Sequence, residues 1–129
     1  LHGEARIFHE GRLQSVVLYE SGTRHGETRM FDEQGRVRAV VPYVAGKRHG
    51  TATWYAPDGQ VVKTAEFQAD RLHGAVREYF PNGRVRSEQT YANGVLHGPS
   101  TIFQADGTVT ERMLFEGGVP HGQAKPPGG

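Results

Sequence analysis

The stretch HGTATWYAPDG, residues 49–59, sets out the pattern that decides the fold. A His-Gly pair leads into strand-forming residues, Thr51 to Tyr55, which end at the turn-forming Pro57-Asp58-Gly59. The His-Gly pair recurs six times along the chain, in steps of 23, 24, 24, 24 and 24 residues. Its copies begin at His2, His25, His49, His73, His97 and His121. A period of this length means that each unit is one supersecondary element that buries its apolar surface against its neighbours.

Ten of the twelve aromatic residues keep the same period. One set lies five residues after a His-Gly glycine: Phe8, Phe31, Tyr55, Tyr79 and Phe103. The other set lies seven residues before the next such glycine: Tyr19, Tyr43, Phe67, Tyr91 and Phe115. Only Trp54 and Phe80 fall outside both sets, so these two require a separate explanation.

Each unit is predicted to form one β-hairpin, because two strand-forming segments alternate with Gly-containing turns and no window has helical apolar spacing. The predicted fold class is all-β: an elongated single antiparallel meander or solenoid of about ten strands, built from five 24-residue hairpin repeats. The repeat array is expected to cover residues 1–122, in units of about 2–24, 25–48, 49–72, 73–96 and 97–120. Residues 123–129, which end in Pro and Gly, are expected to form a flexible C-terminal tail.

A four-residue hairpin loop predicts which side chains share a face. On this register Trp54 opposes Val61 and shares its face with the late-strand aromatics such as Phe67. The opposite face then carries the early aromatics such as Tyr55, beside Arg29, Arg38, Arg77 and Arg86. Arg29 would directly oppose Arg38, which is unfavourable, and a slip of one residue would exchange the two faces. Both registers therefore stay open at this point.

The composition excludes several classes of function. The net charge is +1, from fifteen basic and fourteen acidic residues that are interspersed along the chain. This balance gives no electrostatic footprint for nucleic acid and no polybasic patch for a membrane surface. No apolar run approaches the length of a membrane-spanning helix. The absence of cysteine excludes disulfides but does not identify the compartment. The localisation therefore stays unknown, and the periplasm is slightly favoured over the cytoplasm.

The seven histidines invite a metal or catalytic interpretation. Equivalent positions in successive hairpins lie two strands apart, roughly 9–10 Å, which is too far for ligands of one zinc ion. A histidine in phase is better explained as a turn residue whose ring hydrogen-bonds a neighbouring loop. No nucleophile-elbow, zinc-protease or phosphate-loop motif is present. We therefore expect no catalytic residues, no metal and no cofactor.

The fourth unit departs most from the shared pattern. Glu78 stands where other units have an apolar residue, Phe80 is an extra aromatic, and Asp70 replaces glycine in the turn that precedes this unit. Trp54 and Phe80 could simply pack between strands and loops. The alternative is a surface for a protein partner, since aromatics and Arg concentrate interface energy. Its predicted members are Trp54, Tyr55, Arg77, Glu78, Tyr79 and Phe80.

The turn string Tyr91-Ala92-Asn93-Gly94-Val95-Leu96-His97-Gly98, with Tyr79-Phe80-Pro81-Asn82-Gly83, resembles the variant MORN repeat of bacterial proteins. The resemblance covers residues 1–122 in five copies. It implies an antitoxin or immunity protein that binds a cognate toxin or secreted effector and covers its active site. It implies no catalytic residues. The alternative is a structural or membrane-associated MORN scaffold, which the near-neutral charge disfavours. Exposed terminal strands could also pair two copies of the chain.

Overall fold

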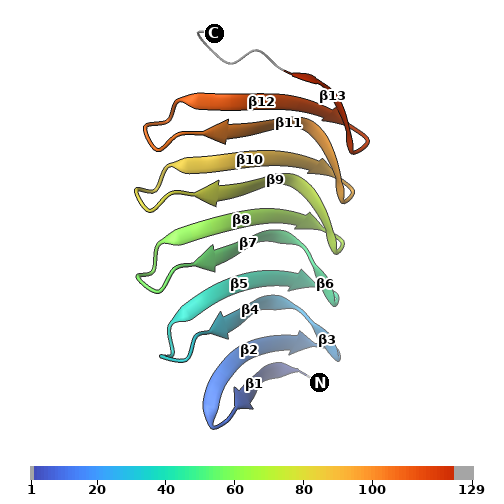
Figure 1. Ribbon diagram of the computed structural model, residues 1–129. Coiled ribbons are helices and arrows are strands. Elements are labelled where there is room, and N and C mark those ends of the chain that lie inside the picture. Colours follow the sequence, from blue (N-terminus) through green and yellow to red (C-terminus); the bar gives the residue numbers. More distant parts are fainter. Residues whose placement is uncertain (1, 124–129) are drawn as a thin grey trace.

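The computed structural model describes residues 2–123 and shows one open antiparallel sheet, in which each strand lies above the previous one (Figure 1). The prediction of an all-β meander of hairpin repeats is confirmed. The strands are β1 (Gly3–His9), β2 (Arg12–Glu20), β3 (Thr23–Arg24), β4 (Gly26–Phe31), β5 (Val37–Val44), β6 (Lys47–Arg48), β7 (Gly50–Tyr55), β8 (Val61–Gln68), β9 (Arg71–Tyr79), β10 (Val85–Ala92), β11 (Val95–Phe103), β12 (Val109–Glu116) and β13 (Val119–Gln123).

Thirteen strands are present where about ten were predicted. The five hairpins supply ten of the eleven strands on the main path, and β13 adds the eleventh. The two remaining strands are short: β3 pairs with β2, and β6 pairs with β5. They are separate from β4 and β7 because the strand is interrupted at His25 and at His49. Gln123 belongs to β13, so the array extends one residue past its predicted end. Residues 124–129, the rest of the predicted tail, lie outside the described residues, as does Leu1.

The turns that join one hairpin to the next are tight because two residues in succession have positive φ. Ser21 and Gly22 have φ of 52° and 82°, and Asn93 and Gly94 have φ of 50° and 84°. These values are typical of type I′ turns, whose twist matches that of the flanking strands. At each turn except the first, the second turn residue donates a backbone hydrogen bond to a carbonyl of the preceding unit. Gly94 N to Leu72 O, at 2.7 Å, is one example.

The hairpin loops lie at the opposite ends of the strands from these turns, and backbone and side-chain hydrogen bonds close them. Ala56 N donates to Gln60 O at 2.8 Å, and Gln60 N donates to the Asp58 carboxylate at 2.9 Å. The first loop is one residue shorter and turns at Glu10 and Gly11, both with positive φ. This shorter loop explains why the first His-Gly step is 23 residues instead of 24.

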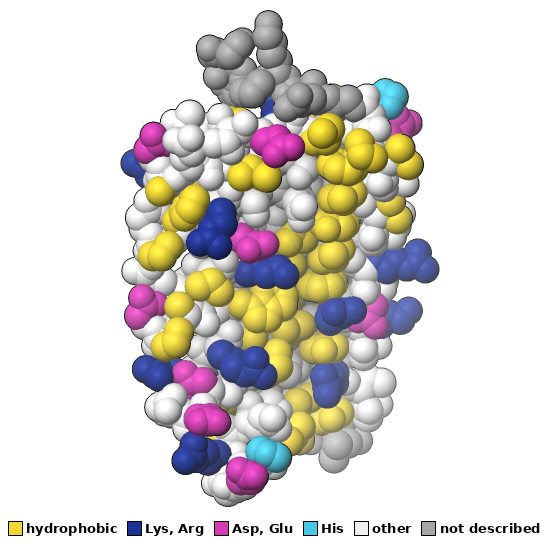
Figure 2. All heavy atoms as spheres, viewed as in Figure 1, with side chains coloured by type: hydrophobic (Ala, Val, Ile, Leu, Met, Phe, Trp, Pro, Cys, Tyr) yellow, Lys and Arg dark blue, Asp and Glu magenta, His cyan; other side chains and the backbone are white. Residues whose placement is uncertain are grey.

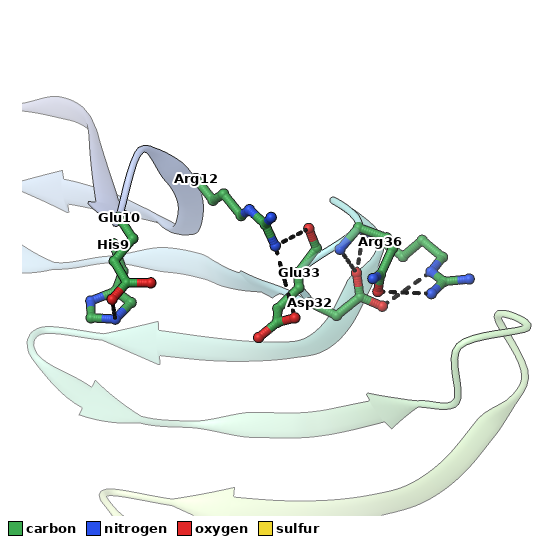
Figure 3. A network of polar contacts seen from close by, with 7 residues as sticks. His9, Glu10, Arg12, Asp32, Glu33 and Arg36 are labelled. Carbon is green, nitrogen blue, oxygen red and sulfur yellow. Dashed lines mark hydrogen bonds and ion pairs between the residues drawn. The ribbon is translucent and has the colours of Figure 1, made fainter.

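Polar side chains join the loops of the first two units (Figure 3). Arg12 donates to the backbone carbonyl of Glu33 at 3.4 Å and lies 3.8 Å from its carboxylate. In the second loop the Asp32 carboxylate accepts hydrogen bonds from the Arg36 amide at 2.9 Å and from its guanidinium at 3.1 Å. The backbone hydrogen bond from Arg36, followed by that from Gln34, lowers the pKa of Asp32. Neighbouring units are thus coupled at both ends of their strands.

A β-bulge follows every hairpin loop, and it corrects the predicted register. Tyr55 opposes Val61, whereas Trp54 opposes Lys63, so Val62 is an extra residue without a partner in β7. The prediction that Trp54 opposes Val61 is therefore wrong. Arg29 opposes Val16 and Val40, not Arg38. The bulge thus removes the unfavourable Arg–Arg pair.

The core is a row of small and β-branched side chains on one face of the sheet. By strand alternation and the observed pairing, this face also carries Trp54, Lys63 and Phe67, and we call it the Trp54 face; the other is the Tyr55 face. The buried hydrophobic residues are Val17, Ala39, Val41, Ala52, Ala65 and Val76, and all of them lie on the Trp54 face. Within the described residues, no second layer covers either face.

Candidate functional site

The late-strand aromatics form a row along the Trp54 face, each opposite a His-Gly glycine. Phe67 opposes Gly50, and Tyr91 opposes Gly74. Pairing an aromatic ring with glycine lets the ring cover the exposed backbone of the adjacent strand. Figure 2 shows a column of hydrophobic side chains along the array, with Lys and Arg side chains beside it. The His-Gly glycines therefore leave room for a continuous apolar column.

Cations on the Trp54 face lie over aromatic rings. Lys63 Nζ is 5.3 Å from the centroid of the Trp54 ring, and the Arg86 guanidinium is 5.0 Å from that of Phe80. Arg24 lies over Tyr43 at 5.1 Å, and Arg48 lies over Phe67 at 4.4 Å. Such contacts are favourable and fix the positions of long cationic side chains. The prediction that Arg38 and Arg86 lie on the Tyr55 face is wrong: Arg86 contacts Phe80 on the Trp54 face, and Arg38 donates to Met30 Sδ there at 4.0 Å.

Two adjoining hollows on the Trp54 face form one groove across the third and fourth units. The first, of about 600 Å³, lies at the loop end and is lined by Phe80, Arg86 and their neighbours. The second, of about 500 Å³, lies toward the inter-unit turns, with Ala65 and Val76 among its lining residues. Trp54, Lys63 and Glu78 line both hollows. We call the combined feature the Trp54 groove.

The six predicted partner-binding residues do not form one surface. Trp54, Glu78 and Phe80 lie along the Trp54 groove. Tyr55 and Arg77 lie on the Tyr55 face, because successive residues of a strand point to opposite sides. Tyr79 follows the same alternation but also borders the loop-end hollow of the groove. The prediction of a single surface is therefore wrong in its grouping. Whether either group binds a partner stays a prediction.

The Tyr55 face differs from the Trp54 face in that most of its charged side chains pair with one another. Arg77 Nε donates to the Glu88 carboxylate at 2.5 Å, and this hydrogen bond raises the pKa of Arg77. Arg6 pairs with Glu4 at 2.7 Å, and Arg29 pairs with Glu27 at 3.3 Å. Tyr79 lies 3.4 Å from the hydroxyl of Thr64. The positive and negative charges of this face therefore largely neutralise one another.

Two in-phase histidines link neighbouring units, as expected from the sequence. His49 Nδ1 accepts a hydrogen bond from the Ala69 amide at 3.4 Å, and His73 Nδ1 accepts one from the Asn93 amide at 3.2 Å. Within residues 2–123, no group of three or more His, Asp or Glu side chains is placed to hold a metal ion. These two rings thus connect one unit to the turn that follows.

Asp70 occupies a position that is glycine in the other inter-unit turns, with φ of 71°. Its carboxylate accepts hydrogen bonds from the Arg48 amide at 2.9 Å and from the Arg48 guanidinium at 3.0 Å. The backbone hydrogen bond, followed by the side-chain one, lowers the pKa of Asp70. Because the folded-state pKa lies below the unfolded one, this contact stabilises the fold above the unfolded pKa and is lost as the pH falls through the folded pKa. Asp70 also anchors Arg48 over Phe67 at the edge of the Trp54 groove.

Sequence reasoning missed the cations of the groove, Lys63 and Arg86. A weak signal was available, since Arg38 and Arg86 both lie twelve residues after a His-Gly glycine and Lys63 lies thirteen after another. Because of the bulge, the side chains at both of these spacings lie on the Trp54 face. Without the bulge, these residues would be divided between the two faces.

Two units of the array match the family model described as the MORN repeat variant, at residues 48–69 and 72–93. These matches support a MORN-repeat protein. They cover the two units that form the Trp54 groove, and the remaining MORN-like units share the same His-Gly period. No curated protein sequence matches the chain.

Solved structures share the shape of the MORN-like array. A mutant of TarM from S. aureus, in complex with fondaparinux, alpha-GlcNAc-glycerol and UDP, aligns with a TM-score of 0.53 at 14% identity, over 85% of this chain and 21% of TarM. A second TarM crystal structure gives a TM-score of 0.52 at 15% identity, over the same shares of the two chains. The chain thus spans about a fifth of the length of these proteins, and at this identity the likeness shows the fold alone. In the described part of the chain, no helix is long and apolar enough to cross a bilayer.

Proposed function

We propose that this MORN-repeat chain is a non-enzymatic protein-binding module whose partner is a cognate bacterial toxin or secreted effector. In this role it neutralises the partner by covering the active site with one face of the sheet. The observation that carries the proposal is the uncovered sheet, which leaves aromatic and cationic side chains of the Trp54 groove accessible. The toxin-neutralising role is suggested by the resemblance to bacterial variant MORN proteins.

The distribution of hydrophobic side chains supports a binding role. Only six hydrophobic residues are buried, whereas eight large hydrophobic residues are exposed in the described part of the chain. The exposed ones are Ile7, Phe8, Val44, Val62, Val95, Ile102, Leu114 and Val119. A contiguous apolar surface is typical of interaction sites, and the column of hydrophobic side chains along the array is of this kind (Figure 2). The array is also large enough to supply an interface of standard size, roughly 1,600 Å² in total.

Co-expression with the protein encoded beside this chain tests the proposal. If that neighbour is a toxic enzyme, the wild-type chain should restore growth and co-purify with it. Replacing Trp54 and Phe80 with alanine should weaken the complex by about 100-fold, as expected for two aromatic interface anchors, with little change in melting temperature. The growth assay and a binding titration measure these effects.

A matched variant, Tyr55→Ala with Phe31→Ala, removes two aromatic rings of the Tyr55 face that do not line the Trp54 groove. It should leave the complex intact if the Trp54 face carries the interaction. Failure of the wild-type chain both to rescue growth and to form a complex would contradict the toxin proposal. Flotation of the chain with anionic vesicles would instead favour the membrane-associated scaffold.

A further inference from the structure

Four cations of the Trp54 face lack acidic partners, and a fifth, Arg48, pairs with Asp70 at 3.0 Å. No carboxylate in the described residues lies within ion-pair distance of the side chains of Arg24, Arg38, Lys63 or Arg86. On the Tyr55 face, by contrast, three arginines pair with glutamates. Strand pairing also places Glu78 and Glu111 on the Trp54 face, and the four unpaired cations outnumber these two carboxylates, which leaves an excess of positive charge there. Such a charged face favours a partner of the opposite sign.

We propose that the Trp54 groove binds an acidic, partly apolar segment of a partner protein, with its carboxylates at Lys63 and Arg86. This inference rests on the proposed protein-binding function and adds the face used and the chemistry of the partner. The aromatic rings under Lys63 and Arg86 hold the two cations in place before the partner arrives. Less side-chain entropy is then lost when a carboxylate binds.

The groove also has room for apolar side chains of the partner. Its lining includes the buried Ala65 and Val76 and the half-buried Leu72. Phe67 and Tyr91 complete this apolar part near the inter-unit turns. An apolar side chain seated there would remove hydrophobic surface from water on both partners. Affinity would therefore come from burial, and orientation from the two cations.

Glu78 distinguishes a peptide from a uniformly anionic polymer. It is exposed and lines both hollows of the groove. Its strand partner is Lys63 of the adjacent strand β8, on the same face of the sheet. A polymer with a negative charge on every unit would bring one of those charges close to this carboxylate. A peptide can place a backbone amide or a neutral side chain at the same point. The groove therefore fits an acidic peptide better than nucleic acid or a sulfated glycan.

A titration of the full chain with a short blocked peptide of alternating Glu and Leu tests the inference. Trp54 is the only tryptophan, so its fluorescence reports directly on the groove. The peptide should change this fluorescence saturably, and a matched peptide of alternating Lys and Leu should not. Lys63→Glu with Arg86→Glu should weaken binding by at least about tenfold, because two charge-assisted contacts become repulsive. The control Arg29→Glu with Arg112→Glu makes the same change in net charge on the Tyr55 face and should leave the affinity within about twofold.

Three results would overturn the inference: no binding of the acidic peptide, equal loss in the two charge-reversal variants, or tighter binding of heparin or oligo-dT than of the peptide. Circular dichroism confirms that each variant is folded. The inference and the proposed function can fail separately. A toxin complex that forms but ignores Lys63→Glu with Arg86→Glu removes the inference and keeps the function. Binding of the acidic peptide without any toxin complex would keep the inference and remove the proposed function.

Discussion

Replacing Gly74 with alanine is expected to destabilise the protein by about 2–3 kcal/mol. Gly74 has φ of 113°, a conformation that side-chain-bearing residues rarely adopt. A Cβ atom there would also overlap the carboxylate of Glu66, which accepts a hydrogen bond from the Ala75 amide at 2.7 Å. The substitution therefore adds backbone strain and displaces a hydrogen-bonded side chain. Denaturant unfolding followed by circular dichroism measures the loss.

Gly83→Ala separates these two contributions. Gly83 has φ of 88°, but no atom lies within 4 Å of a Cβ placed there, so only the backbone cost of about 1 kcal/mol is expected. Adding Glu66→Ala to Gly74→Ala should recover part of the larger loss. Equal losses for Gly74→Ala and Gly83→Ala would mean that the Glu66 contact has no energetic role.

Replacing Ala65 with proline is expected to cost about 3 kcal/mol or more. Ala65 lies in β8 at the middle of the array and is paired with Ala52 on one side and Val76 on the other. It is also buried, at 2% exposure, so the proline ring would have to displace its neighbours. Units of a repeat array are stabilised mainly by adjacent units, so the break should also lower the cooperativity of unfolding. The slope of the denaturant transition measures cooperativity, and its midpoint measures stability.

Thr90→Pro is the matched control for this substitution. Thr90 precedes Tyr91 as Pro42 precedes Tyr43, so the native chain already tolerates proline at the equivalent position of another unit. The ladder from β10 to β11 also skips Thr90, which lies at a register shift. Proline is accepted at such irregularities, and the expected cost is below about 1 kcal/mol. A severe loss for Thr90→Pro would show that units are not equivalent.

The periodic part of the sequence was sufficient to predict the fold. The His-Gly step, the turn glycines and the late-strand aromatics require hairpins that stack in register, and the faces of Ala39, Ala65 and Phe67 follow from alternation. The bulge could not be predicted, because Val61, Val62 and Lys63 all suit an uninterrupted strand and none is a bulge-forming glycine. It arises where the closed loop from Ala56 to Gln60 meets the longer second strand.

The candidate site was predicted only in part. Trp54 and Phe80 stood out because they break the aromatic period, and both lie on the groove. Tyr55 and Tyr79 were grouped with them through proximity in sequence, which in a strand places neighbours on opposite faces. Lys63 and Arg86 were missed because a cation–ring contact joins residues of different strands and depends on the bulged register.

Cross-linking of introduced cysteines tests most directly whether hairpins stack as one bulged sheet. The chain has no cysteine, so any disulfide must come from the introduced pair. Thr53→Cys with Thr64→Cys joins residues that oppose each other only in the bulged register, and Val40→Cys with Thr53→Cys joins neighbouring units. Both variants are predicted to form intramolecular disulfides under mild oxidation. Cross-linking of Thr53→Cys with Val62→Cys instead, the pair that an unbulged hairpin would oppose, would contradict the register and with it the Trp54 groove.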